Sequence, residues 1–206
     1  MTARRIGVGA TVLALAVLGW AVVARKGDGM MMGGTGSYLG IWVAMTVAMM
    51  LPSAAPTLLL VDTLSRRAAP FFAVGYLLVW TALGALAYAV STRVSWHPTA
   101  ALLVAAGVYQ VSPLKQACLR RCRHPLAFLR RYAAEPPLAV GARHGAFCVG
   151  CCGGLMVVLL ALGMSSLAWM AAAGAVIGAE KLMPHGERVA AASAVALLGA
   201  GGWMAL

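Results

Sequence analysis

The chemistry that this sequence could support is concentrated in sulfur atoms. Cys148, Cys151 and Cys152, with Met156 after them, place three thiols and a thioether within nine residues. On a helix, residues three and four positions apart share a face, so these sulfur atoms would converge. Soft sulfur ligands suit a thiophilic metal ion such as Cu(I), with Zn(II) as an alternative. The spacing therefore predicts a metal site on one helical face.

A second pair of thiols lies upstream in a basic segment. Cys118 and Cys122 are four residues apart, so they also share a helical face. If the two groups meet, they would build a site of three or four sulfur atoms. The alternative is that these cysteines are small apolar residues that fill helix contacts. An odd count of five cysteines, without the pattern of a small secreted domain, does not predict a disulfide framework.

Two further kinds of side chain are candidate metal ligands. Met45, Met49 and Met50 lie in one apolar run, and thioethers remain Cu(I) ligands where thiols would be oxidised. Methionine is also an ordinary filler of apolar helices. Glu180 is the acid placed nearest a membrane span, which makes it a site hypothesis. Its alternative role is an ion pair with Lys181 or with an arginine.

Several enzyme classes are not favoured by the sequence. It contains no phosphate-binding G-x4-G-K-[ST] loop, no H-E-x-x-H motif and no G-x-S-x-G elbow. Five acidic residues in all leave little for paired-carboxylate catalysis. These absences favour a role other than an enzyme.

The composition is that of an integral membrane protein. The 206 residues are 62% hydrophobic and 10% charged, with a mean hydropathy of +0.88. A soluble domain would carry roughly a quarter charged residues. The apolar runs are long and continuous, without the alternation of a β-barrel, and this selects helices. We therefore expect an all-α, polytopic transmembrane bundle whose surroundings are the lipid bilayer.

The apolar runs predict about seven spans in a single transmembrane domain over residues 1–206. Their ranges are 6–24, 38–61, 70–90, 99–113, 145–164, 167–182 and 189–206. The first run could instead be a signal peptide, although it is long for one. Pro52 and Pro56 predict a kink or a break in the second span. A basic loop at 114–144 would follow the fourth span, with an amphipathic helix on the headgroups at 115–129.

The positive charges predict the orientation of these spans. With the N-terminus in the cytoplasm, thirteen of the sixteen Lys and Arg residues fall on the cytoplasmic side. This distribution explains the net charge of +11 without a nucleic-acid partner, and it suits a bacterial inner membrane. All five cysteines then lie on the cytoplasmic side, three of them at the start of the fifth span. Thiols stay reduced in that compartment and are available as ligands.

Several motifs follow one another in an order that is similar to a known family. They are Trp42-x2-Met45-x3-Met49-Met50-x-Pro52, Gly75-Tyr76-x3-Trp80, Tyr109-Gln110-x2-Pro113-Leu114-Lys115-x2-Cys118-x3-Cys122-Arg123, Cys148-x-Gly150-Cys151-Cys152-x2-Leu155-Met156, Gly163-Met164-x4-Trp169-Met170 and Glu180-Lys181-x2-Pro184-x-Gly186. Over residues 38–188 the chain resembles the DUF2182 family of bacterial integral membrane proteins predicted to bind metal. The resemblance implies several membrane-spanning helices and a metal site, with no established reaction. Gly153 stands where many members have a bulky residue, which would open the helix face.

The leading hypothesis is a membrane protein that binds a thiophilic metal, with Cu(I) favoured, for transport, delivery or homeostasis. A metallochaperone or another membrane subunit would be its partner. One alternative is a thiol–disulfide electron carrier that uses Cys148 with Cys151, or Cys118 with Cys122. Another is a non-catalytic assembly subunit of a membrane complex, which would dock through its Gly/Ala-rich last span.

Overall fold

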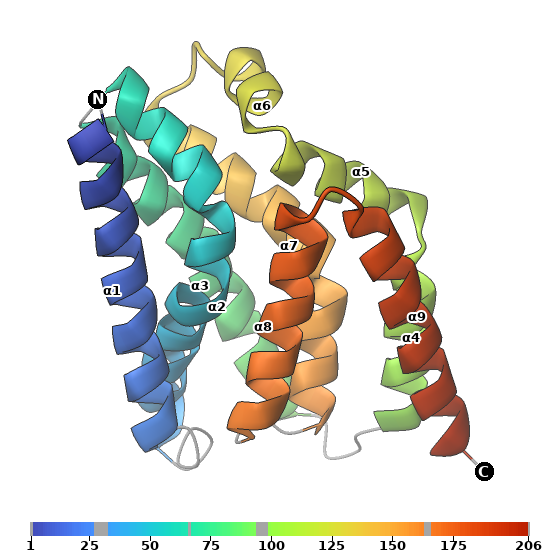
Figure 1. Cartoon of the computed structure of the whole chain (residues 1–206). Coiled ribbons are helices and arrows are strands. Elements are labelled where there is room, and N and C mark those ends of the chain that lie inside the picture. Colours follow the sequence, from blue (N-terminus) through green and yellow to red (C-terminus); the bar gives the residue numbers. More distant parts are fainter. Residues whose placement is uncertain (1, 27–32, 66, 94–98, 163–165, 206) are drawn as a thin grey trace. The chain divides into compact units, whose positions relative to one another are not determined.

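A computed structural model describes residues 2–26, 33–65, 67–93, 99–162 and 166–205 of the chain. Within these residues all regular structure is α-helical, which confirms the predicted all-α class (Figure 1). The helices are α1 (Thr2–Lys26), α2 (Gly34–Leu64), α3 (Ala68–Ser91), α4 (Thr99–Gln110), α5 (Pro113–Arg123), α6 (Pro125–Arg131), α7 (Pro137–Leu162), α8 (Leu167–Leu182) and α9 (Gly186–Trp203).

Four of these helices are long and apolar enough to cross a membrane. The candidate segments are Arg5–Lys26, Gly34–Leu64, Ala68–Ser91 and Pro137–Leu160. The remaining predicted spans correspond to α4, α8 and α9, with 12, 16 and 18 residues. A helix needs about 20 residues to cross a bilayer without help from its neighbours. The total of seven spans and the cytoplasmic N-terminus therefore remain predictions.

The chain divides into two compact units, described separately below. Unit 1 consists of Met1–Val90 and His124–Ala146, and unit 2 of Ser91–Arg123 and Phe147–Leu206. The boundary falls within α7, between Ala146 and Phe147. The sequence predicts one domain over residues 1–206, and this remains a prediction.

Unit 1 packs α2 closely against its neighbours in sequence. The indole of Trp42 donates a hydrogen bond of 2.8 Å to the carbonyl of Trp80 on α3. Gly84 leaves room for this ring, because a Cβ there would lie 2.5 Å from Cδ1 of Trp42. His144 lies among the rings of Phe72 and Phe128, with centroids 5.5 and 5.1 Å away. Large aromatic side chains thus fill the interior of this unit.

The second span has no break, because α2 runs without interruption from Gly34 to Leu64, and the alternative of a kink stays a prediction. Pro52 and Pro56 lie inside it, and each removes one backbone donor. Ser53 donates through its hydroxyl to the carbonyl of Met50, at 2.8 Å. This bond is an addition beside Pro52, because the carbonyls that lose a donor lie four residues before each proline.

The basic segment is more helical than the sequence predicts. The single amphipathic helix expected over 115–129 is two helices, α5 and α6, that meet at His124. Pro125 explains the division, since proline starts α6 and disfavours helical backbone in the residue before it. The helix that would carry the fifth span begins at Pro137, before the predicted residue 145, while the bounds of the span itself stay a prediction. Pro137 is a favourable first residue for α7, and polar Arg143 and His144 continue the helix.

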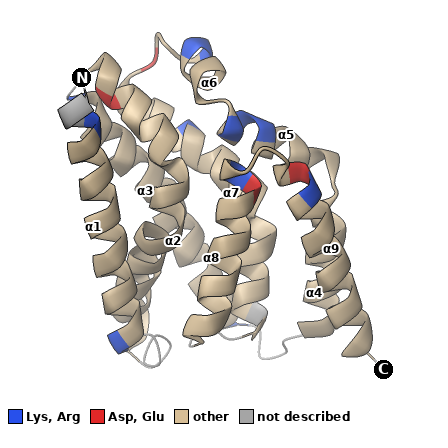
Figure 2. Ribbon diagram, in the orientation of Figure 1, with Lys and Arg blue, Asp and Glu red and all other residues tan. Residues whose placement is uncertain are grey.

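Unit 2 contains α4, α5, α8, α9 and the part of α7 after Ala146. Glycines let α4 and α9 approach closely, because a Cβ on Gly107 would lie 2.8 Å from Leu198 and one on Gly201 would lie 2.8 Å from Val104. Small residues serve this purpose in membrane helices. Charged side chains of this unit gather on α5 and at the turn between α8 and α9 (Figure 2).

Apolar side chains face outward in both units while several charged ones are buried. Leu86 and Val195 are 60% and 72% exposed, whereas Lys115 and Glu180 are 0% and 1% exposed. Water would favour the opposite arrangement. Lipid as solvent accounts for it, and buried ionisable groups of this kind mark functional positions.

Candidate metal centre

The centre of unit 2 is a group of three thiols on α7. The Sγ atoms of Cys148, Cys151 and Cys152 all lie within 4.8 Å of one another. Each residue is buried, with at most 1% of its surface exposed. Their spacing brings them together within two helical turns, as the sequence predicts. Metal–sulfur bonds of about 2.3 Å in a trigonal arrangement place sulfur atoms about 4 Å apart, so the group has a suitable size.

Cys151 connects this group to α5. Its Sγ lies 3.3 Å from Sγ of Cys152 and 3.7 Å from Sγ of Cys122. Its thiol also donates to the carbonyl oxygen of Cys148, at 3.3 Å. The two cysteine groups that the sequence left separate therefore meet through the pair Cys122–Cys151. Cys122 contacts the three-thiol group from outside it.

Cys118 lies outside the three-thiol group, against the backbone of α7. A Cβ on Gly150 would lie 2.5 Å from its Sγ, so the glycine is what lets α5 approach α7 here. Burial raises the pKa of the Cys118 thiol, and the charge of Arg121 lowers it in part. We propose a packing role for Cys118 rather than the ligand role that the sequence suggests.

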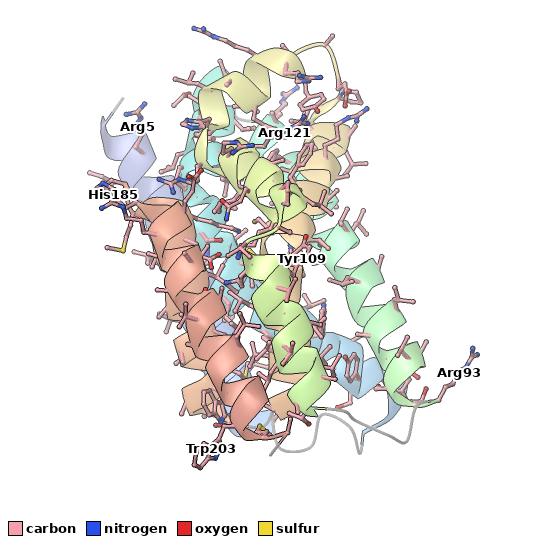
Figure 3. The ribbon with its side chains drawn as sticks, turned by 90° about the vertical axis from the view of Figure 1, so that its right-hand side faces the viewer. Arg5, Arg93, Tyr109, Arg121, His185 and Trp203 are labelled. Carbon is pink, nitrogen blue, oxygen red and sulfur yellow. The ribbon has the colours of Figure 1, made fainter. Side chains whose placement is uncertain are left out.

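Tyr109 at the end of α4 supports the same stretch of α7 (Figure 3). Its hydroxyl donates to the carbonyl of Gly150 at 2.5 Å. A Cβ on Gly154 would lie 2.9 Å from its ring. Cys118 therefore packs on Gly150, and Tyr109 packs on Gly154. These two contacts hold α5 and α4 against the part of α7 that carries the thiols.

Lys181 of α8 is a site residue that sequence reasoning missed. Its Nζ donates a hydrogen bond of 2.9 Å to Sγ of Cys148. Lys181 is itself buried. The thiolate is the form of cysteine that binds metal, and an ammonium group beside it offsets its negative charge. The signal in the sequence was a lysine at the end of a predicted membrane span, since ionisable residues there often belong to a site. The sequence did not show which residue it contacts.

Glu180, the residue before Lys181, serves a different network. Its carboxylate accepts from Lys115 Nζ at 2.7 Å and from Gln110 Nε2 at 2.8 Å. Ser193 on α9 adds a hydrogen bond of 3.4 Å, and Gln110 also contacts Ser193 and Lys115. The carboxylate is therefore bonded to protein groups, and the expected partners Lys181 or an arginine are replaced by Lys115. We assign Glu180 to this network rather than to the metal.

Arginine and glycine complete the end of α8. Arg123 donates to the carbonyls of Glu180, Met183 and Pro184, at 3.3, 2.7 and 2.7 Å. A guanidinium there satisfies helix-terminal carbonyls that lack partners. Gly186 lies so close to the carbonyl of Glu180 that a Cβ would overlap it. These contacts tie α5 to the turn that follows Lys181.

The thioethers lie in two different places. Met156 is buried on α7, four residues after Cys152, and its role as a softer ligand stays a prediction. Met45, Met49 and Met50 are buried in α2 and belong to unit 1. Their role as metal contacts also stays a prediction.

The thiols lie deeper along their helix than the sequence suggests. Because α7 starts at Pro137 rather than at 145, Cys148 is about 16 Å along the helix axis from its first residue. The start of the helix does not fix where the membrane begins, so the position of the thiols at the cytoplasmic start of the fifth span stays a prediction.

Comparison with protein families provides an independent result. The model of the PpoB2 family, described as a copper chaperone, matches residues 39–204. This confirms the coarser part of the resemblance, a copper-related and membrane-associated family, while the DUF2182 name stays an expectation. Searches of curated proteins and of solved structures return no significant match. The match covers most of the chain, including every cysteine, and the chain therefore belongs to the PpoB2 copper chaperone family.

Proposed function

We propose that this protein is a multi-pass chaperone of the bacterial inner membrane that holds one Cu(I) ion on Cys148, Cys151 and Cys152. The observation that carries the proposal is the three buried thiols within 4.8 Å of one another. Family membership and this group together support copper binding. The protein would receive the ion from one partner and deliver it to another, such as a metallochaperone or a copper-dependent membrane subunit.

The choice of Cu(I) rests on the number and softness of the ligands. Thiolates select Cu(I), zinc or iron–sulfur clusters over harder ions. Structural zinc sites are nearly always tetrahedral with four protein ligands. The group offers three thiols from one helix, and the fourth sulfur within reach belongs to Cys122 on α5. Three buried thiols on one helix favour an ion that accepts few, soft ligands, as Cu(I) does.

The direct test is metal analysis of the full chain purified in detergent under reducing conditions. We expect one copper per chain, and none in the variant Cys148→Ser/Cys151→Ser/Cys152→Ser. X-ray absorption at the copper edge should report Cu(I) with sulfur neighbours only. Copper bound equally by the triple variant, or zinc bound in preference to copper by the wild type, would overturn the proposal.

One contact favours a second candidate function. The Sγ atoms of Cys122 and Cys151 lie 3.7 Å apart, which makes them the pair that would form a disulfide between α5 and α7. A thiol–disulfide electron carrier would use such a pair and would need no metal. Mass analysis of metal-free protein after capture of a mixed disulfide with a partner would favour this function over copper binding.

A further inference from the structure

The five cysteines differ in their access to the outside of the molecule. Cys118, Cys148, Cys151 and Cys152 are buried, whereas Cys122 is partly exposed. Cys122 is also the thiol that contacts the three-thiol group from another helix, through Cys151. A metal ion that reaches the buried group along sulfur atoms would therefore meet Cys122 first. From Cys122 the next sulfur is that of Cys151, 3.7 Å away, and the sulfur of Cys152 lies 3.3 Å beyond it.

The surface around Cys122 is strongly basic. Arg120 and Arg121 precede Cys122 on α5 and are exposed, and Arg123, which is half-buried, follows it. We call these four residues, 120–123, the basic face of α5. The guanidinium of Arg121 lies 4.6 Å from the ring centroid of Phe147, which fixes this face on α7. Arg123 is bonded to the carbonyls of Met183 and Pro184, which precede His185, so the exposed His185 belongs to the same end of unit 2 as Arg121 (Figure 3).

Negative charge is scarce in this unit. Unit 2 contains seven Lys and Arg residues and two acids, Glu180 and Glu187. Glu180 is buried and bonded to Lys115, so Glu187 is the exposed acid. A surface with one sign of charge raises the rate at which partners of the opposite sign arrive. The basic face of α5 therefore fits an acidic partner.

We infer that Cys122 is the thiol that receives Cu(I), and that it does so from an acidic protein which carries the ion on two thiolates and docks on the basic face of α5. This inference rests on the proposed function. In the first exchange a bond forms between copper and the sulfur of Cys122, and one bond between copper and a donor sulfur breaks. The Cys122 proton passes to the departing donor thiolate, and no electron moves, because copper stays Cu(I). Cys151 then replaces the second donor thiolate in the same way. Cys152 next bonds to copper as the bond between copper and Cys122 breaks, and the Cys152 proton passes to the Cys122 thiolate. Cys148, whose sulfur accepts a hydrogen bond from the Lys181 ammonium, adds as a thiolate and has no proton to release.

The test measures how fast the full chain in detergent acquires Cu(I) from a synthetic Cys-x-x-Cys peptide rich in glutamate. We expect Cys122→Ser to slow loading about tenfold, a larger effect than its loss of equilibrium affinity, because a positioned receiving group is missing. Ala117→Ser is the control on the same helix, because it adds a hydroxyl outside the sulfur contacts, and it should load at the wild-type rate. An equal rate for C122S and wild type would overturn the inference, as would an affinity loss as large as the rate loss, which would make Cys122 a permanent ligand.

The docking surface is tested by charge. Arg120→Glu should slow loading from the glutamate-rich peptide about tenfold at low salt, whereas Arg120→Lys should not. A lysine-rich peptide of the same design should load the wild type slowly, and added salt should reduce the difference between the two peptides. If these arginines only contact lipid headgroups, both peptides should load the protein at the same rate. That result would overturn the proposal that the basic face of α5 is a docking surface.

The two proposals fail in different ways. If the wild type binds no Cu(I) from any donor, the proposed function fails. If the wild type and Cys122→Ser bind one Cu(I) each and load at the same rate, copper binding stands and the role of Cys122 is wrong. Circular dichroism and thermal unfolding of each variant, compared with wild type, separate these outcomes from loss of the fold.

Discussion

At the scale of single residues, two adjacent side chains on α8 divide the chemistry of unit 2. Lys181 donates to the sulfur of Cys148, and Glu180 is bonded to Lys115 and Gln110. Successive residues on a helix point about 100° apart, so neighbours in sequence reach different partners. One of the pair touches the proposed copper ligands and the other fixes the helices around them.

We predict that Lys181→Met weakens Cu(I) binding about tenfold, because the thiolate of Cys148 loses the positive charge beside it. Lys181→Arg keeps the charge and should retain most of the affinity. Competition with a chromogenic Cu(I) chelator measures both. Unchanged affinity in the methionine variant would show that the ammonium does not stabilise the metal-binding thiolate.

Glu180→Gln is predicted to destabilise the fold and to leave copper stoichiometry at one per chain. The Lys115–Glu180 pair is 0% and 1% exposed, so removing the carboxylate charge leaves a buried ammonium without its counter-charge. The expected loss in free energy of unfolding is about 3 kcal/mol. Thermal or denaturant unfolding in detergent measures this loss.

The double variant Glu180→Gln/Lys115→Met provides the control for this pair. Removing the lysine charge as well should recover much of the lost stability, since no buried charge remains unpaired. A different result, loss of copper with unchanged unfolding, would return Glu180 to the metal ligands that the sequence first suggested.

At the scale of helices, glycines on α7 decide how closely α4 and α5 approach the thiols. Gly150 accepts the Cys118 sulfur and Gly154 accepts the Tyr109 ring. Gly153, between them, has Val149 Cγ1 as the nearest atom to a Cβ, at 3.9 Å. Three glycines in one short stretch thus have different structural roles, and Gly150 is the one that sets how closely the helix of Cys122 approaches Cys151.

Gly150→Ala is predicted to push α5 away from α7, because its Cβ would lie 2.5 Å from Sγ of Cys118. The separation of Cys122 from Cys151 should then increase and copper loading should slow. Gly153→Ala is the matched control and should load normally. The double variant Gly150→Ala/Cys118→Ala, which removes the clashing sulfur, should regain part of the rate. Disulfide crosslinking between Cys122 and Cys151 in metal-free protein measures their proximity directly.

At the scale of the whole molecule, the family match and the charge pattern provide the larger context. The matched region, residues 39–204, runs from α2 to α9 and includes residues of both units, while α1 lies before it. Within unit 2, Arg121 and His185 lie at one end and Arg93 and Trp203 at the other (Figure 3). This separation suits a unit that crosses the bilayer with its arginine-rich end in the cytoplasm.

The predicted orientation places Arg130 in the cytoplasm and Arg93 outside. In a cysteine-free chain, Arg93→Cys should react with a membrane-impermeant maleimide in intact cells, and Arg130→Cys should react only after the membrane is opened. Labelling of both positions in intact cells, or the reverse pattern, would contradict this topology. The same experiment decides whether the basic face of α5 is accessible to a cytoplasmic copper donor.

The sequence by itself determined the features that depend on local spacing and composition. The apolar runs specified an all-α protein with helices able to cross a membrane, because an unpaired backbone is too costly in lipid. The positions of Cys148, Cys151 and Cys152 were sufficient to bring three sulfur atoms together, since helical periodicity is a local property. The sequence did not predict that the helix of the fifth span already begins at Pro137, because polar residues continue that helix ahead of the apolar run.

Only the tertiary structure decided which distant side chains meet. Cys122 contacts Cys151 across 29 positions of sequence, and Lys181 rather than Glu180 reaches Cys148 across 33. Such contacts depend on how one helix is rotated and translated against another, and small residues such as Gly150 control that fit. The sequence could name the candidate sulfur ligands, but it could not tell which thiol is exposed, which is buried, and which charge lies beside them.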